Sequence, residues 1–287
     1  MPDSSLELPA PAKINLFLHI CGRRPDGYHN LQTVFQFLDI GDTLRFYPTA
    51  NGAIRLATPM TGIAHDDNLI VRAARALQQA SGCQLGADIA IDKYLPSGAG
   101  LGGGSSDAAT TLLALNRLWQ LDLPGATLAG IGRQLGADVP IFIHGHSAWA
   151  EGIGEQLTDM SPAEAWYLLL VPPCHVSTGA IFSHPQLTRH SKMMKIPPSL
   201  EPGMAGHFRN DCETLVRQLY PDVDQAFQAL SAVGKARMTG TGACVFAAFD
   251  NRQQALEASR QMPATMQALV SKGCNESPLH RALGSSV

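Results

Sequence analysis

Charge is scarce in this sequence. Only 16% of the 287 residues are charged, the formal net charge is −3, and lysine occurs only at positions 13, 93, 192, 195, 235 and 272. A protein that binds nucleic acid or an anionic membrane through its electrostatic field needs a basic face. No basic run is present, so we expect neither nucleic acid nor a membrane among the partners.

Long apolar runs and paired cysteines are also missing. A run such as Trp166–Val171 is far shorter than the roughly 20 residues of a membrane-spanning helix. The first residues contain no apolar core of a secretory signal. The six cysteines lie far apart without a C-x-x-C pair, which is typical of reduced, buried thiols rather than of a disulfide framework. We therefore predict a cytoplasmic protein.

Apolar material for a core is present, at 45% hydrophobic residues, over a length that favours two domains. Apolar residues alternate along Lys13–Ile20, which predicts a strand with one buried face and with Lys13 and Asn15 on the other face. The Pro-Asp-Gly sequence at 25–27 favours a turn, and the next apolar run completes a predicted hairpin.

The rest of the pattern predicts an α+β fold, because the strands alternate instead of being apolar throughout. We predict helices over 66–82, 106–119, 127–136, 213–219, 223–230 and 252–262, and strands over 87–95, 166–171, 236–239, 244–249 and 266–271. Asp66 or Asp67 is expected to cap the first helix and Thr127 the third. Residues 183–206 lack any period and predict a loop, and the chain from about Ser277 is predicted to be a tail.

Glycine is concentrated in LPSGAGLGGGSSDAA, residues 95–109, between a predicted strand and a predicted helix. Glycines let a backbone approach an anion, and free amides at a helix N-terminus favour negative charge. The stretch therefore predicts a phosphate-binding loop rather than a flexible linker. Gly98, Gly100 and Gly103 also satisfy a dinucleotide fingerprint, although the preceding strand alternates. The lysine of a Walker A loop and the downstream motifs of a protein kinase are absent.

The same stretch resembles the phosphate loop of the GHMP kinases. DGYHNLQT (26–33), DNLIVRAA (67–74), LGADVPIFIHG (135–145) and TGTGACVFAAF (239–249) extend the resemblance to nearly the whole chain. DGYHNLQT is the most specific of them, and it is similar to members that act on a cytidine-diphosphate sugar alcohol in the non-mevalonate isoprenoid pathway.

The resemblance implies a two-domain GHMP kinase fold with the active site in the cleft between the domains. Residues 1–152 would form the N-terminal domain with the glycine-rich phosphate loop, and residues 153–287 the C-terminal α+β domain. The implied enzyme is a small-molecule kinase that transfers phosphoryl from ATP, with Mg²⁺ on the phosphates, to the 2-hydroxyl of the sugar alcohol.

Two residues match the catalytic positions of this family, Asp138 and Lys13. A carboxylate accepts the proton of the attacking hydroxyl and holds it in line, and a cation stabilises the charge on the transferring group. The residues alone favour other roles, namely a helix cap for Asp138, two positions before Pro140, and a solvent-facing strand residue for Lys13. The family match favours the catalytic roles, and the cap is compatible with catalysis.

The resemblance places four residues at the substrate. Asn15 shares a strand face with Lys13 and is expected to hydrogen-bond the substrate. Tyr28 and His29 match positions at the cytosine, and Phe182 matches a position that stacks on its other side, as proteins read a lone base. From the sequence pattern alone, Tyr28 is as readily a hairpin residue packed on its neighbouring strand.

The predicted ATP site combines the phosphate loop with two positions that match the family's contacts to the nucleotide base, Asn68 and Lys93. The loop residues expected to contact ATP are Pro96, Ser97, Gly98, Ala99, Gly100, Leu101, Gly102, Gly103, Gly104, Ser105 and Ser106. The second glycine loop, 239–243, is expected to line the cleft or to form a tight hairpin turn. His144 and His146 have metal-like spacing, but no third ligand is evident nearby, so we predict structural histidines and no metal ligands.

Other functions remain open at this stage. The chain is also compatible with a different GHMP kinase, with a nucleotide sensor that binds ATP without releasing ADP, or with an NAD(P)-binding oxidoreductase that uses Asp122 as the acidic residue of its fingerprint. A monomer and a homodimer are both compatible with the sequence.

Overall fold

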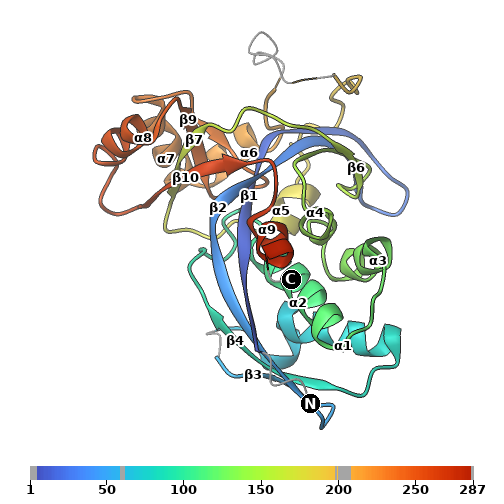
Figure 1. The fold of residues 1–287 in the computed structure, drawn as a ribbon. Coiled ribbons are helices and arrows are strands. Elements are labelled where there is room, and N and C mark those ends of the chain that lie inside the picture. Colours follow the sequence, from blue (N-terminus) through green and yellow to red (C-terminus); the bar gives the residue numbers. More distant parts are fainter. Residues whose placement is uncertain (1–4, 59–61, 198, 200–207, 286–287) are drawn as a thin grey trace.

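The computed structural model describes residues 5–58, 62–197, 199 and 208–285, which form a mixed sheet with helices packed on it (Figure 1). The strands are β1 (Leu6–Arg23), β2 (His29–Thr49), β3 (Ile54–Leu56), β4 (Gly86–Asp92), β5 (Ala148–Glu151), β6 (Gln156–Asp159), β7 (Trp166–Val171), β8 (Arg237–Met238), β9 (Val245–Phe249) and β10 (Gln267–Cys274). The helices are α1 (Leu69–Ser81), α2 (Gly103–Leu118), α3 (Gly125–Leu135), α4 (Val139–His144), α5 (Thr178–Ser183), α6 (Glu213–Leu219), α7 (Pro221–Ser231), α8 (Arg252–Ser259) and α9 (Pro278–Ser285), with a short 3₁₀ helix η1 (His65–Asp67). None of the helices in these described ranges has the length and apolar character required to cross a membrane.

The hairpin of β1 and β2 runs along the molecule and touches both of its ends (Figure 1). The predicted hairpin is confirmed, but the expectation of a single buried face is wrong. Ile14 packs in an apolar cluster with Leu101 and Leu169, while Lys13 and Asn15 on the opposite face are only 2% and 4% exposed. Both faces are buried because the glycine-rich loop and the C-terminal strands cover one of them and helices cover the other.

The strand order is β3-β4-β2-β10-β7-β9-β8, with β1 and β5 also paired to β2. β4, which leads into the glycine-rich loop, lies antiparallel to β2. A dinucleotide-binding fold requires a parallel sheet at this point. Asp122 follows helix α2 rather than the end of a second strand, so the oxidoreductase interpretation is wrong.

Two apolar cores give the molecule two lobes. The first core joins β1, β2 and β4 to helices α1 to α4, and the second joins β7 and β9 to α6 and α7. Residue 152 lies in the turn between β5 and β6, which are hydrogen-bonded to each other. Leu279 of α9 packs in the first core, so dividing the chain at this turn does not separate the two cores completely. A domain boundary at residue 152 stays a prediction.

Three local predictions differ from the structure. Helix α1 is capped by Asn68, whose side-chain oxygen accepts a hydrogen bond from the Ile70 amide, and not by Asp66 or Asp67. Thr127 lies inside α3, which begins after Pro124. Residues 278–285 form helix α9 instead of a tail, because Leu279 is fully buried and Pro278 starts the first turn.

Candidate active site

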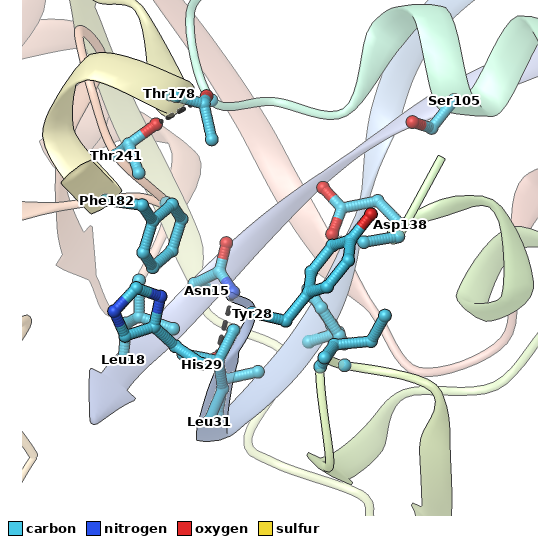
Figure 2. A pocket seen from close by; sticks show the side chains of 18 of the residues that line it. Asn15, Leu18, Tyr28, His29, Leu31, Ser105, Asp138, Thr178, Phe182 and Thr241 are labelled. Atoms are coloured by element: carbon cyan, nitrogen blue, oxygen red, sulfur yellow. Dashed lines mark hydrogen bonds between the residues drawn. The ribbon is translucent and has the colours of Figure 1, made fainter. Parts of the chain in front are cut away.

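A pocket of about 640 Å³ lies beside the β1–β2 hairpin and receives residues from both lobes (Figure 2). We call Lys13, Asn15 and Asp138 its charged end, and Tyr28, His29 and Phe182 its aromatic end. The predicted site residues that line the pocket are Lys13, Asn15, Tyr28, His29, Gly100, Ser105, Asp138 and Phe182.

Lys13 is the centre of the charged end. Its ammonium nitrogen lies 3.0 Å from an Asp138 carboxylate oxygen and donates hydrogen bonds to Asn15 Oδ1 at 2.7 Å and to the Gly100 carbonyl at 3.3 Å. An ammonium group has three donors, and these three acceptors match that number. Lys13 is therefore a buried, fully engaged cation and not a solvent-facing strand residue.

Asp138 stands at the N-cap position of α4, yet its side chain makes no capping hydrogen bond to that helix. The carboxylate turns to Lys13 and remains 33% exposed on the pocket side. The helix-cap alternative is therefore correct for the backbone position and wrong for the side chain. Because the Asp138 carboxylate is not used to cap the helix, it is available to a bound molecule.

Asn15 links the charged end to both lobes. Its side-chain amide donates to Thr33 Oγ1 on β2 at 2.9 Å, and its backbone amide donates to Thr239 Oγ1 at 2.9 Å. Because these two contacts fix Asn15, its Oδ1 is held toward the Lys13 ammonium and helps to orient it before any ligand binds.

The glycine-rich loop ends directly in helix α2. Gly98, Gly100 and Gly102 have φ angles of 69°, 77° and 75°, a conformation that side-chain-bearing residues rarely adopt. Gly102 is the N-cap of α2 and supplies no side-chain cap, so the first amides of the helix have no partner within it. Ser105, on the same first turn, directs its hydroxyl toward the pocket (Figure 2). The arrangement suits an anionic ligand.

Other loop residues hold the loop in place. The Leu101 carbonyl accepts the Lys13 amide at 2.9 Å, and the Ala99 carbonyl accepts the Cys244 amide at 3.1 Å. Both side chains are buried. These two strand-like contacts fix the bend of the loop from opposite lobes.

The second glycine loop is both a tight turn and a wall of the pocket, as each of the two interpretations predicts. The Gly242 amide donates to the Thr239 carbonyl at 3.0 Å, which closes the turn between β8 and β9. Gly240 and Thr241 line the pocket, and the Thr241 hydroxyl lies 2.9 Å from that of Thr178 on α5.

The aromatic end leaves a gap between two ring surfaces. His29 and Phe182 stack with ring centroids 5.3 Å apart and an interplanar angle of 28°. The Tyr28 ring stands across the pocket from them (Figure 2) and is 59% exposed. Tyr28 therefore does not pack on a neighbouring strand. The Phe182 ring, predicted to stack on the cytosine opposite Tyr28 and His29, stacks on His29 in this structure, and its contact with a base stays a prediction.

Two predicted nucleotide contacts, Asn68 and Lys93, are absent from the described lining of this pocket. Asn68 is buried at the cap of α1. Lys93 lies 2.5 Å from Asp42 and 2.9 Å from Asp107, below the start of α2. Burial, opposed by Lys93 and assisted by Asp42, raises the pKa of Asp107 to about 7. A contact of Asn68 or Lys93 with ATP stays a prediction.

The sequence does not indicate every residue of the site: Thr33 and Thr178 line the pocket, and Arg189 supports it, without having been predicted. Arg189 donates to His29 Nε2 at 3.0 Å from the aperiodic segment after α5. A segment without a period offers no signal for such a contact. His144 binds Asp159 at 2.6 Å and lies outside the pocket.

The comparisons with known proteins agree with this geometry. Residues 68–146 match the GHMP kinases N terminal domain, and residues 197–268 match the GHMP kinases C terminal domain. The chain is thus a GHMP kinase in its class, and both lobes contribute residues to the pocket described above.

The particular family follows from closer relatives. The 4-diphosphocytidyl-2-C-methyl-D-erythritol kinase of Pseudomonas putida (strain W619) is 57% identical over 98% of this chain and 97% of its own length. The protein of the same name from Pseudomonas syringae pv. tomato is 55% identical over 99% of each chain. A solved 4-(cytidine 5'-diphospho)-2C-methyl-D-erythritol kinase is 30% identical with a TM-score of 0.78, over 93% of this chain and 99% of the other. The chain belongs to the 4-diphosphocytidyl-2-C-methyl-D-erythritol kinase family.

A solved mevalonate kinase shares the fold at a TM-score of 0.69 and 14% identity, over 94% of this chain and 100% of the other. At this identity the likeness concerns the fold alone.

Proposed function

We propose that this protein transfers the γ-phosphoryl group of ATP to the 2-hydroxyl of 4-diphosphocytidyl-2-C-methyl-D-erythritol. The observation that carries the proposal is the 3.0 Å pair of Lys13 and Asp138, which lies in one pocket between an uncapped helix N-terminus and a gap between aromatic rings. Phosphoryl transfer requires this spatial order: a site for the phosphates at one side, a site for the acceptor molecule at the other, and the acid-base pair between them.

Asp138 is placed to bind the attacking hydroxyl. Its carboxylate is partly exposed in the pocket and is held by Lys13, so it can accept a hydrogen bond from the hydroxyl. It can take the hydroxyl proton as the oxygen bonds to the γ-phosphorus and the bond from that phosphorus to the bridging oxygen breaks, with ADP as the leaving group. Lys13 keeps the carboxylate oriented and places positive charge beside the oxygen atoms that gain negative charge. Asn15 orients Lys13 and faces the same substrate.

The glycine-rich loop fits the phosphates of ATP. A Cβ at Gly100 would lie 2.6 Å from the Thr239 carbonyl and one at Gly102 would lie 3.0 Å from Lys13 Cε, so the loop packs too closely for side chains. The first amides of α2 and the Ser105 hydroxyl are the donors available to phosphate oxygens.

Mg²⁺ bound with ATP would neutralise charge on the phosphates. Magnesium is commonly held by one or two protein oxygens together with phosphates and water. The Ser105 hydroxyl, on the first turn of α2, is a protein oxygen that this part of the pocket offers for that purpose.

Tyr28, His29 and Phe182 are proposed to bind the cytosine, because the Tyr28 ring stands across the pocket from the stacked pair and proteins bind a lone base by stacking and by hydrogen bonds to its edge. The cytoplasmic location and the choice between monomer and homodimer stay predictions.

An ADP-release assay tests the proposal. The cytidylylated substrate is compared with mevalonate, homoserine and galactose at equal concentration with ATP and Mg²⁺. We expect saturable ADP release with the cytidylylated substrate alone. Faster release with one of the others would make the protein a different GHMP kinase, and ATP binding without any release would make it a nucleotide sensor.

A further inference from the structure

Arg189 connects two elements that carry the aromatic end of the pocket. It lies in the segment that follows α5, and its side chain is half-buried. Its Nε donates to His29 Nε2 at the start of β2, at 3.0 Å. One terminal nitrogen donates to the carbonyls of Phe182 and His184 at 2.9 and 2.7 Å, and the other donates to the Leu187 carbonyl at 3.1 Å.

The carbonyl contacts act on α5. The last carbonyls of a helix lack partners within the helix, and cationic side chains satisfy them. Phe182 belongs to the last turn of α5, and His184 is its C-cap. Arg189 therefore fixes the end of the helix from which the Phe182 ring enters the pocket.

The contact with His29 determines where that ring carries its proton. A guanidinium group only donates hydrogen bonds, so Nε2 of His29 must be the acceptor. The proton of the neutral ring is then on Nδ1. The ring presents an N–H donor at Nδ1, which suits the acceptor atoms N3 and O2 of cytosine.

The electrostatic setting keeps the ring neutral. Burial lowers the pKa of His29, and the positive charges of Arg189 and Arg23 lower it further. These two arginines are the charged groups that act on the ring from the segment after α5 and from β1 respectively. A neutral imidazole retains the lone pair that Arg189 requires.

We propose that Arg189 is a positioning residue for recognition of the cytosine: it holds His29 as the Nδ1-protonated ring, and it holds α5 so that Phe182 stacks on that ring. This inference rests on the proposed function, because it names the residue that sets the base-binding arrangement. Arg189 does not touch the charged end, so its effect is confined to substrate affinity.

Three variants test this role. Arg189→Gln removes the charge and the planar fork. Arg189→Lys keeps a cationic donor but not the fork. Arg209→Gln is the matched control, since Arg209 binds Ser191 in the same segment and Asp211 outside the pocket. Thermal unfolding and the KM for ATP show whether each variant is folded.

We expect Arg189→Gln to raise the KM for the cytidylylated substrate roughly tenfold, the scale of one buried hydrogen bond, with kcat and the KM for ATP within about twofold of wild type. The KM of Arg189→Lys for this substrate should lie between those of wild type and Arg189→Gln, and the KM of Arg209→Gln should equal that of wild type. A fall in kcat at unchanged KM, or an equal rise in KM for Arg209→Gln, would overturn the proposal.

Nitrogen NMR of ¹⁵N-histidine-labelled protein provides a readout that a merely structural residue would not change. The His29 signals are assigned by their loss in His29→Gln. We expect the Nδ1–H form in the wild type and a shift toward the Nε2–H form in Arg189→Gln. The Nε2–H form in the wild type, or the same form in both proteins, would refute the proposal. This measurement needs no substrate, so it remains decisive even if the cytidylylated compound is not turned over by the wild type.

Discussion

The charged end and the aromatic end of the pocket are built in different ways. At the charged end, Lys13 is 2% exposed and has three partners within 3.3 Å, all from regular elements or the anchored loop. At the aromatic end, Tyr28 is 59% exposed, and the stacked pair depends on a contact from an aperiodic segment. The reacting groups are thus positioned before substrate binds, while the recognition surface combines a turn residue with the start of β2 and the end of α5, both of which Arg189 holds from a loop. Changes at the charged end should act on kcat, and changes at the aromatic end on KM.

The largest expected effect is that of Asp138→Asn, which removes the proton acceptor but keeps the side chain's shape. We expect kcat to fall by about 10³-fold, within the usual range for loss of a general base. ATP affinity, measured by calorimetry, should stay unchanged because Asp138 acts on the acceptor. The control is Asp159→Asn, which changes a carboxylate bound to His144 outside the pocket. A kcat near that of wild type would remove Asp138 from the chemistry.

The contact between the two glycine loops is tested by Gly100→Ala. The new Cβ would lie 2.6 Å from the Thr239 carbonyl and 3.0 Å from the Gly242 carbonyl, at a φ of +77°. Strain and overpacking together should lower the free energy of unfolding by about 3 kcal/mol, as measured in urea. Gly82→Ala has a similar φ of +70° but open space, so it should cost only about 1 kcal/mol. Equal losses would show that the loops do not need their close approach.

A smaller effect is expected at the aromatic end from Tyr28→Ala. Stacking on a base contributes about 1–3 kcal/mol, so the KM for the cytidylylated substrate should rise roughly tenfold. The KM for ATP should not change, and neither should kcat. Tyr47→Ala is a suitable control, because Tyr47 is 47% exposed on β2 and is not among the described lining residues. Equal losses for the two substrates in Tyr28→Ala would mean that the residue is only structural.

The smallest expected effect is a pH dependence at the aromatic end. The pKa of His29 lies below its ordinary value, chiefly through burial and then through Arg189 and Arg23, so the ring should stay neutral in the folded protein down to below pH 6.5. The unfolded chain takes up the proton first, so stability is retained above the unfolded pKa and decreases as the pH falls below it. We expect the KM for the cytidylylated substrate to be constant from about pH 8 to about 6.5 and to rise severalfold only at lower pH, because the ring in the folded protein takes up its proton below its ordinary pKa. If the KM of His29→Gln rises in the same way at low pH, the pH dependence belongs to another group.

The hairpin, the glycine-rich loop and most helices follow from patterns in the sequence, because alternation and capping are local properties. The meeting of Lys13 and Asp138 does not, since periodicity cannot show which strand residue faces which helix N-terminus. Only the family resemblance joined them. The burial of Lys13 could not be predicted either. Alternation identifies the apolar face that contains Ile14, but it does not indicate what covers the opposite face.

Two misses have different causes. Helix α9 carried usable signals, namely Pro278 at its first position and an apolar stripe of Leu279, Ala282 and Leu283, which the sequence analysis took for a tail. Arg189 carried none, because a lone arginine in an aperiodic segment gives no indication of the ring that it contacts. The residues of the charged end were therefore predicted more completely than the contact of Arg189 with His29, which supports the aromatic end.

The return of α9 to the first core has a consequence for biosynthesis. Leu279 is fully buried among residues that include Leu8 of β1, although nearly the entire chain separates them. A ribosome releases the N-terminal strands long before this leucine. The core of the first lobe therefore lacks one of its buried residues until the second lobe has been synthesised. During synthesis, chaperones should bind chiefly to the surface that α9 later covers.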